Sequence, residues 1–207
     1  MWVWLQADAQ DANFDLAYQT NRALAPVAAL AREVPCFKYL GKRGLIGFND
    51  ATANPKTDEL KRNAALILDG GRASYAFSQK WVHDLGKFNA EPVAQQEKIV
   101  GRTKVTDEEL EGDAMPPDSH VSRMDLKEDG VTLKIYRRSA PFGGVGEHGL
   151  YFLAFACDPR RVDPQLEDIY GLAGDRLHDR LIEHSRAVTG AYWHMLGQDE
   201  LKSVIGR

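Results

Sequence analysis

The sequence predicts an α+β fold in which helices cover antiparallel sheets. Two patterns predict it: runs of apolar and aromatic residues typical of strands, and stretches in which apolar residues recur at helical spacing. A glycine-rich connector between two strand-like runs indicates a hairpin, whose strands pair antiparallel. Strands and helices alternate along the 207 residues without a repeat or a low-complexity segment. This alternation with hairpins is typical of α+β proteins.

The N-terminal part is predicted to hold one helix between short strands. Residues 2–5, Trp-Val-Trp-Leu, have strand composition. A helix is expected over residues 13–34, with a kink or a second start at Pro26. Short strands are expected at residues 36–40 and 45–48, around a glycine turn. An exposed strand at the N-terminus would be a template for another chain, so a homo-oligomer is expected.

The rest of the chain supplies the larger set of predicted elements. Apolar and aromatic runs predict strands, apolar residues at helical spacing predict helices, and a polar, acidic stretch with two prolines predicts a long loop. The expected elements are strands at 64–69 and 74–84, a helix at 92–99, a loop at 103–119, an antiparallel pair at 131–138 and 149–157 joined by 143–149, and a helix at 164–184.

Composition narrows the class of protein. Hydrophobic residues make up 43% and charged residues 27%, which is enough apolar material for a packed core. A net charge of −4 gives no basic footprint for nucleic acid or for a membrane surface. No apolar run is long enough to span a bilayer, and no signal peptide is visible. Cys36 and Cys157 lie far apart, as in a reduced cytoplasmic protein.

Arg137 is a candidate functional residue because of its place in the predicted strand 131–138. Alternation puts it on the same face as Val131, Leu133 and Ile135. A guanidinium that faces a core needs an anion, a carboxylate or a polar ligand as a partner. The alternative is an arginine at the strand end that reaches solvent.

Asp50 and His120 are the other two candidates. Asp50 lies in a run of turn-forming residues, 47–55, where its side chain could simply bond backbone amides ahead of a helix. His120 has no second histidine or cysteine at ligand spacing, which excludes a zinc site and leaves an ordinary polar histidine as the alternative. The other five histidines show no pairing.

Several blocks of sequence, taken together, resemble the dye-decolourising (DyP-type) peroxidases, in that family's order. The loop Gly-Phe-Asn-Asp-Ala-Thr-Ala-Asn-Pro at 47–55 is similar to the family's GxxDG-containing loop. The further blocks are GRTK at 101–104, DSHVSR at 118–123, KIYRRS at 134–139 with PFG at 141–143, GLYF at 149–152 and AVTG at 187–190. The resemblance covers most of the chain from about residue 36 onward.

The resemblance implies a ferredoxin-like fold of the dimeric α+β barrel type. Family members are built from two such units. Residues 1–60 would form a partial N-terminal unit that carries the distal loop, and residues 61–207 a complete C-terminal haem-binding unit. The implied cofactor is haem b.

The resemblance also implies roles for the residues on the proximal side of the haem. His120 would be the ligand of the haem iron. Asp179 would accept the N–H of His120 and make the imidazole more basic, with Asp175 as the fallback. Arg102 would contact a haem propionate.

On the distal side, the resemblance implies that Asp50 and Arg137 form the catalytic pair. A carboxylate can relay a proton between the two oxygens of peroxide, and a fixed cation can offset the charge on the departing oxygen. Arg137 and Ser139 would also line the haem pocket, with Ser139 holding a water. Ala51 replaces the second glycine of the family's loop. If that position needs a positive φ, the alanine weakens or retunes activity.

The implied function is a haem b peroxidase that uses hydrogen peroxide to oxidise bulky organic compounds (dyes, phenolics or porphyrinogens) through a ferryl intermediate. Its partners would be peroxide and an organic reductant. One alternative is a haem-binding or carrier protein with little turnover. Another is an iron-free relative used for assembly.

Overall fold

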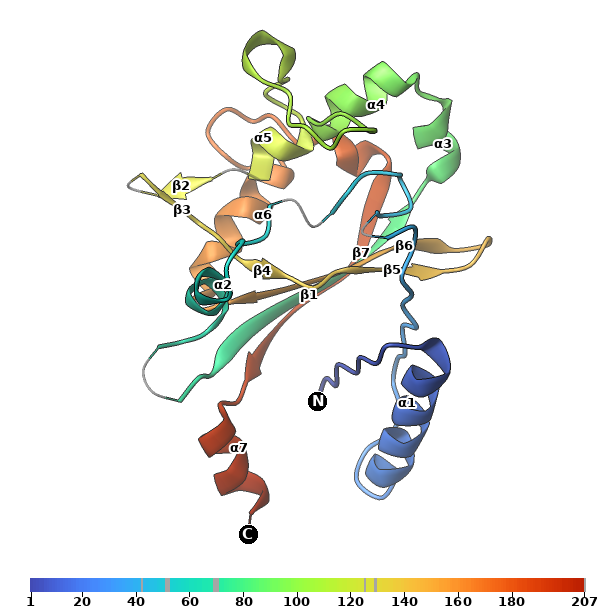
Figure 1. Ribbon diagram of the computed structural model, residues 1–207, viewed down its shortest axis with the longest axis vertical. Helices are drawn as coiled ribbons and strands as arrows, with labels where there is room; N and C mark the ends of the chain where they lie inside the picture. The colour runs from blue at the N-terminus through green and yellow to red at the C-terminus, as the bar shows by residue number, and fades with distance from the viewer. Residues whose placement is uncertain (42, 51–52, 69–70, 125, 129, 207) are drawn as a thin grey trace.

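The computed structural model describes residues 1–41, 43–50, 53–68, 71–124, 126–128 and 130–206 (Figure 1). Its centre is a five-stranded antiparallel sheet. The strand order across the sheet is β4 (Tyr136–Arg137), β6 (His148–Ala156), β1 (Ser74–His83) and β7 (Ser185–Met195). The fifth strand, β5 (Ala140–Gly143), pairs with another part of β6. The α+β prediction is confirmed.

The connections identify the topology. Between β1 and β4 the chain forms α3 (Leu85–Ala90), α4 (Val93–Val100) and α5 (His120–Met124), and between β6 and β7 it forms α6 (Asp163–Ile169). The order of strands is therefore β-α-β-β-α-β with the first strand between the third and the last, which is the ferredoxin-like arrangement. Helices α3 to α6 lie on one side of the sheet, and α1 (Gln10–Leu24) and α7 (Gln198–Ile205) on the other (Figure 1).

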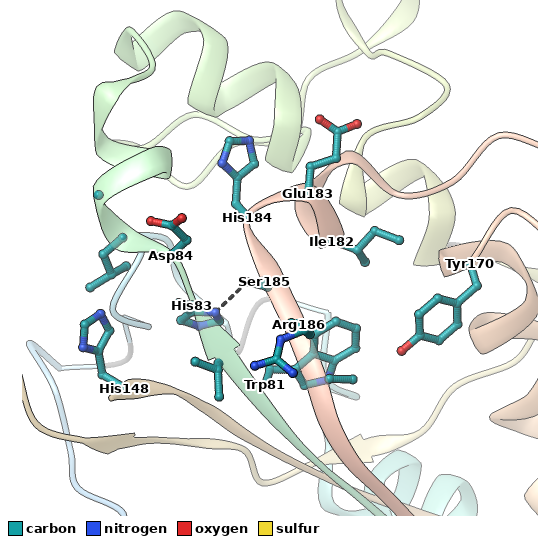
Figure 2. A pocket seen from close by; sticks show the side chains of 14 residues that line it. Trp81, His83, Asp84, His148, Tyr170, Ile182, Glu183, His184, Ser185 and Arg186 are labelled. Atoms are coloured by element: carbon teal, nitrogen blue, oxygen red, sulfur yellow. Dashed lines mark hydrogen bonds between the residues drawn. The ribbon is translucent and has the colours of Figure 1, made fainter. Parts of the chain in front are cut away.

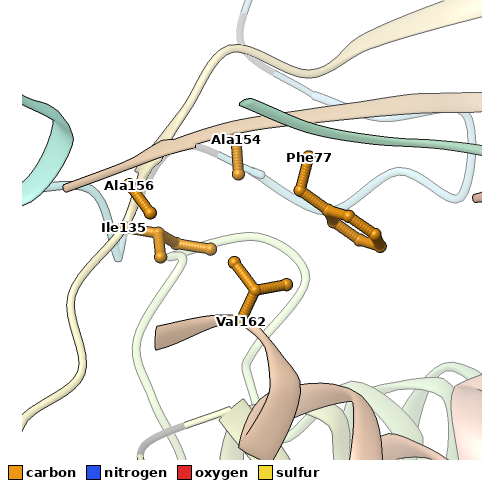
Figure 3. Packing of buried hydrophobic residues seen from close by; sticks show 5 residues of the cluster. All are labelled: Phe77, Ile135, Ala154, Ala156 and Val162. Carbon is orange, nitrogen blue, oxygen red and sulfur yellow. The ribbon is translucent and has the colours of Figure 1, made fainter. Parts of the chain in front are cut away.

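A hydrophobic cluster packs α6 against the sheet. Phe77 of β1 and two alanines of β6, Ala154 and Ala156, meet Ile135 and Val162, and all five are buried (Figure 3). Val162 directly precedes α6, so the cluster marks the helix-covered face of the sheet. Burial of these side chains, at roughly 25 cal/mol per Å² of apolar area, holds the two layers together.

The strand register decides which face carries Arg137. Arg137 lies directly opposite Ala154, whose side chain belongs to the cluster under α6. Residues directly opposite in an antiparallel pair share a face, so Arg137 lies on the helix-covered face together with Ile135. The predicted inward direction of Arg137 agrees with this register. The prediction of one continuous strand over 131–138 is wrong. Its first residues form β3 (Val131–Thr132), which pairs with β2 (Lys127–Glu128) in a separate two-stranded sheet.

The N-terminal region differs from the predictions in several ways. Residues 2–5 are not a strand; instead, the indole of Trp2 stacks on Trp193 of β7, with centroids 5.7 Å apart. Helix α1 ends at Leu24, two residues before Pro26, because proline has no N–H to continue the helix. The described residues do not form the strands expected at 36–40 and 45–48. Cys36 forms an isolated bridge with Phe142, and Arg43 and Asn49 form another on either side of 45–48.

Two further assignments of secondary structure were wrong, one in type and one in length. The apolar run at 64–69 was expected to be a strand, but Asp58–Ala65 forms helix α2, which Thr57 caps by accepting the N–H of Leu60. The helix expected at 164–184 is shorter: α6 ends at Ile169 and only a 3-10 turn, η3 (Arg180–Glu183), follows before β7. Two further 3-10 turns are η1 (Gly112–Ala114) and η2 (Pro159–Arg161).

Strand β7 and helices α3 and α7 were not predicted. In the part of the chain that is described, no helix combines the length and apolarity needed to cross a membrane.

Candidate active site

His120 and Asp179 form a hydrogen-bonded pair in the layer of helices. The distance from Nδ1 of His120 to Oδ2 of Asp179 is 2.6 Å. Asp179 is buried, whereas the side chain of His120 keeps 31% of its surface accessible. Among the described residues, Nε2 of His120 has no hydrogen-bond partner. With Nδ1 donating to the carboxylate, the lone pair of Nε2 is left free for a ligand.

Backbone contacts hold this pair in place. The N–H of Asp179 donates to the carbonyl of Ile169, and its Oδ1 accepts the N–H of Leu181 as the cap of η3. The next residue, Arg180, donates its N–H to the carbonyl of Asp118, just before α5. The loop that carries the carboxylate is therefore tied to the segment that carries the imidazole.

Asp50 lies at the end of a loop that the core anchors. Phe48 is buried and packs edge-on against Phe88 of α3. The side-chain amide of Asn49 donates to the carboxylate of Asp107 at 3.1 Å. Arg43 forms an ion pair with the same carboxylate, also at 3.1 Å. These contacts fix the loop immediately before Asp50.

Arg137 and Ser139 come from the edge of the sheet beside that loop. Both are partly buried. The backbone of Arg137 is bonded to the side chain of Asn54, and Oγ of Ser139 accepts the N–H of Leu153 at 3.3 Å. Asn54 was not predicted as a site residue. The contact of Asn54 with Arg137 depends on which backbone groups the sheet leaves unpaired. No sequence pattern shows which groups these are.

Electrostatics connect His120 with Asp50 and Arg137. Burial would lower the pKa of His120, but the charge of Asp179 and the hydrogen bond to it outweigh burial, so this pKa lies above its ordinary value. The positive charge of Arg137 lowers the pKa of His120, and the negative charge of Asp50 raises it. Arg137 of β4 and Asp50 of the loop before α2 thus both lie within electrostatic range of His120 in α5.

The remaining predicted residues have other contacts. Asp175, the fallback partner, instead binds Arg123, with 2.7 Å between Oδ2 and Nη1. The guanidinium of Arg102 is buried and bonded to the carbonyl of Asp107 and the carboxylate of Glu109. Ala51, together with its proposed effect on Asp50, lies outside the described residues.

A cavity of about 630 Å³ lies at the ends of β1 and β7 (Figure 2). His120, Asp50 and Arg137 do not line it. His83, which does, bonds Ser185 at 2.6 Å, the dashed contact in Figure 2. Burial and the charge of His148 lower the pKa of His83 to about 4, while Asp50 acts in the opposite direction. His83 therefore lines this cavity and lies within electrostatic range of Asp50, which the sequence did not suggest.

Curated relatives match nearly the whole chain but only part of their own length. A dye-decolorizing peroxidase from Mycobacterium tuberculosis (strain H37Rv) is 34% identical over 195 residues, which is 90% of this chain and 57% of the relative. One from Mycolicibacterium paratuberculosis is 33% identical over 192 residues, 90% of this chain and 54% of the relative. The chain thus spans about half the length of these relatives.

Solved structures agree with the sequence comparisons. A putative DyP-type peroxidase from Shewanella oneidensis has a TM-score of 0.91 at 31% identity, over 95% of this chain and 65% of that one. DyPB from Rhodococcus jostii RHA1 has a TM-score of 0.89 at 36% identity, over 96% of this chain and 66% of that one. Variants of that protein are known in complex with haem. A family model described as "Dyp-type peroxidase, C-terminal" matches residues 41–200. The chain belongs to the DyP-type peroxidase family.

Proposed function

We propose that this chain binds haem b and uses hydrogen peroxide to oxidise bulky organic compounds such as dyes, phenolics or porphyrinogens. The observation that carries the proposal is the pair of His120 and Asp179. A buried carboxylate accepts a hydrogen bond from Nδ1–H and leaves Nε2 of a partly accessible imidazole without a partner among the described residues. An imidazole held in this way is the usual proximal ligand of haem iron in peroxidases.

The residues present fit the cofactor. His120 would hold the iron through Nε2, and Asp179 would fix the tautomer and the orientation of its ring. Arg102 is the proposed propionate contact. Because Arg102 already binds Glu109, whose side chain is half exposed, a propionate would share the guanidinium with Glu109 or replace it. Related haem complexes support this assignment of the cofactor.

Haem, when bound, would supply the electrons that reduce peroxide and would then take electrons from the organic compound. The side chains of the chain move the protons and offset the charge. Asp50 would take the proton from one peroxide oxygen and deliver it to the other. Arg137 would stabilise the negative charge that develops on the departing oxygen, and Ser139 would hold a water beside them.

The test is a haem titration of the purified chain followed by absorption spectroscopy. The chain should take up one haem with a Soret band, and His120→Ala should lose stable binding. His178→Ala is the matched control, because the side chain of His178 is half exposed and bonds Glu183, not His120 or Asp179. If His120→Ala kept the spectrum and affinity of the unchanged protein, the proximal assignment would be wrong.

The second candidate is a haem-binding or carrier protein with little turnover, which the replacement of the second loop glycine by Ala51 favours. Peroxide-dependent oxidation of an anthraquinone dye or of guaiacol separates the two. If the unchanged protein oxidises these compounds and both Asp50→Asn and Arg137→Leu lower its turnover, the result supports the proposed peroxidase function. Haem uptake without turnover in the unchanged protein supports the carrier.

A further inference from the structure

Strand β4 lies at the edge of the sheet and leaves backbone groups of Arg137 open on its outer side. In an antiparallel pair, successive residues direct their N–H and C=O groups alternately toward the partner strand and away from it. Arg138 donates its N–H inward, to the carbonyl of Leu153 at 2.7 Å. The N–H and C=O of Arg137 therefore face away from β6.

The side chain of Asn54 binds both of these groups. Its Oδ1 accepts the N–H of Arg137 at 2.8 Å, and its Nδ2 donates to the carbonyl of Arg137 at 3.0 Å. A planar amide with one donor and one acceptor matches the pair of groups that a neighbouring strand would otherwise bind. Two bonds to one residue also fix the direction of the contact, which a single bond would not.

Pro55 and the start of α2 restrain Asn54 on the loop side of the contact. Pro55 follows and is buried, and a residue before proline is restricted to extended conformations. Thr57 then caps α2. Asn54 lies only four residues after Asp50. Its side-chain amide therefore ties the segment of Asp50 to Arg137, which lies 83 positions after Asn54 in the chain.

We infer that Asn54 is a positioning residue that sets the distance and orientation between Asp50 and Arg137. The inference rests on the proposed function, in which these two side chains act together on peroxide. Asn54 bonds the backbone of Arg137 and is not proposed to touch the reacting atoms. It acts by replacing the missing neighbour of β4 with a side chain from the loop of Asp50.

The experiment compares Asn54→Ala, Asn54→Asp and a matched control, Thr57→Ala, which removes a cap on the same segment without touching Arg137. In the haem-free chain, hydrogen exchange measured by NMR should be about tenfold faster at the Arg137 amide in Asn54→Ala, as expected for the loss of one hydrogen bond. Asn54→Asp keeps the acceptor and should protect this amide more than Asn54→Ala does. The control should leave it protected. Unchanged exchange in Asn54→Ala would overturn the inference whether or not haem binds.

In the haem-loaded chain, Asn54→Ala should lower kcat/KM for peroxide on the order of 10- to 100-fold, since small misplacements have effects of this size. Haem affinity and kcat/KM for the organic reductant should stay unchanged. The decrease should largely vanish when Arg137→Leu is already present, because the residue being positioned is then gone. A decrease that persists in full in the Arg137→Leu background, or an equal decrease in Thr57→Ala, would show a merely structural role and overturn the inference. If the chain binds no haem at all, the proposed function is overturned, and the role of Asn54 toward peroxide is overturned with it. The hydrogen-exchange data still decide whether the contact between Asn54 and Arg137 holds the loop.

Discussion

At the scale of single residues, the pair of His120 and Asp179 shows how burial and charge oppose each other. Burial favours a neutral imidazole, and the adjacent carboxylate favours a charged one. The carboxylate has the larger combined effect, so the imidazole is more basic than a free histidine. A basic imidazole is a stronger donor to a metal ion.

Replacing the carboxylate should reverse this balance. In the haem-free chain, Asp179→Asn should move the pKa of His120 below its ordinary value, because burial and the charge of Arg137 then dominate. An NMR titration of the imidazole measures it. Asp175→Asn is the control, since Asp175 binds Arg123 instead. A pKa of His120 that stays raised in Asp179→Asn would contradict the account.

His83 should make the stability of the haem-free chain depend on pH. Its pKa is about 4 in the folded chain against an ordinary 6.5. Between these values the unfolded chain binds a proton that the folded chain does not, so the free energy of unfolding falls as the pH is lowered from 6.5 to 4. At 1.36 kcal/mol per unit the loss reaches about 3 kcal/mol.

Urea unfolding across this range tests the effect of His83. His83→Gln should remove most of the decrease in the free energy of unfolding that His83 causes between pH 6.5 and pH 4. Glutamine keeps a polar group beside Ser185. His178→Gln, at a half-exposed position, should leave the fall in place. Equal pH dependence in His83→Gln and the unchanged protein would exclude His83 as its source.

The sequence was informative about single residues where the chemistry depends on residue type. Asp50, His120 and Arg137 stood out by their motifs, and in the structure Asp50 and Arg137 both lie within electrostatic range of His120. Asn54 and His83 did not stand out. The contact of Asn54 depends on the open edge of β4, and the low pKa of His83 depends on burial, which only the assembled sheet determines.

At the scale of elements, the packing of α4 against the start of α5 positions His120. Helix α4 ends at Val100 and is capped by Gly101, which has φ +86. A Cβ added there would lie 2.8 Å from Oγ of Ser119 and 2.9 Å from Cβ of Val121. These two residues flank His120, so only glycine lets the two helices approach so closely.

Gly101→Ala should therefore cost about 2–4 kcal/mol of stability, from backbone strain and from overpacking together. It should also weaken haem binding, because α5 must shift. Gly112→Ala is the matched control: its φ is +53, but no atom lies within 4 Å of the added Cβ, so only the strain of about 1 kcal/mol remains. Urea unfolding and haem titration measure both effects. Equal losses in the two variants would contradict the packing argument.

Elements with clear alternation were predictable, and those that depend on tertiary contacts were not. The strand at 74–84 was confirmed as β1, with a boundary difference of one residue. Strand β7 was missed because Val188 falls by coincidence at helical spacing from Leu177 and Leu181. The run at 64–69 has strand composition, but the cap at Thr57 starts a helix before it.

At the scale of the whole molecule, α1 projects away from the sheet (Figure 1). None of its residues is buried. Phe14 and Tyr18 stack on each other and are 66% and 54% exposed. Adjacent exposed aromatic side chains of this kind are typical of interaction surfaces. We predict that the chain self-associates through α1, because the N-terminal residues do not form the expected strand.

The chain should self-associate at micromolar concentration, and Phe14→Ser/Tyr18→Ser should shift it toward the monomer. Leu201→Ser/Val204→Ser, which changes two exposed apolar residues of α7, should have little effect. Analytical ultracentrifugation compares the three proteins. A monomer in the unchanged protein would rule out this surface as a self-association site.

The stack of Trp2 on Trp193 gives the molecule an optical signature of its own N-terminus. The two indoles are nearly parallel, with an angle of 18° between their planes. We expect these indoles to couple their electronic transitions and to produce a paired band in circular dichroism, because transition dipoles that are skewed within a stack do so. The strength of this band reports whether the N-terminal segment is docked on the sheet. Anything that displaces the segment, including a partner that covers this side of the sheet, should be visible as loss of the band without any added label.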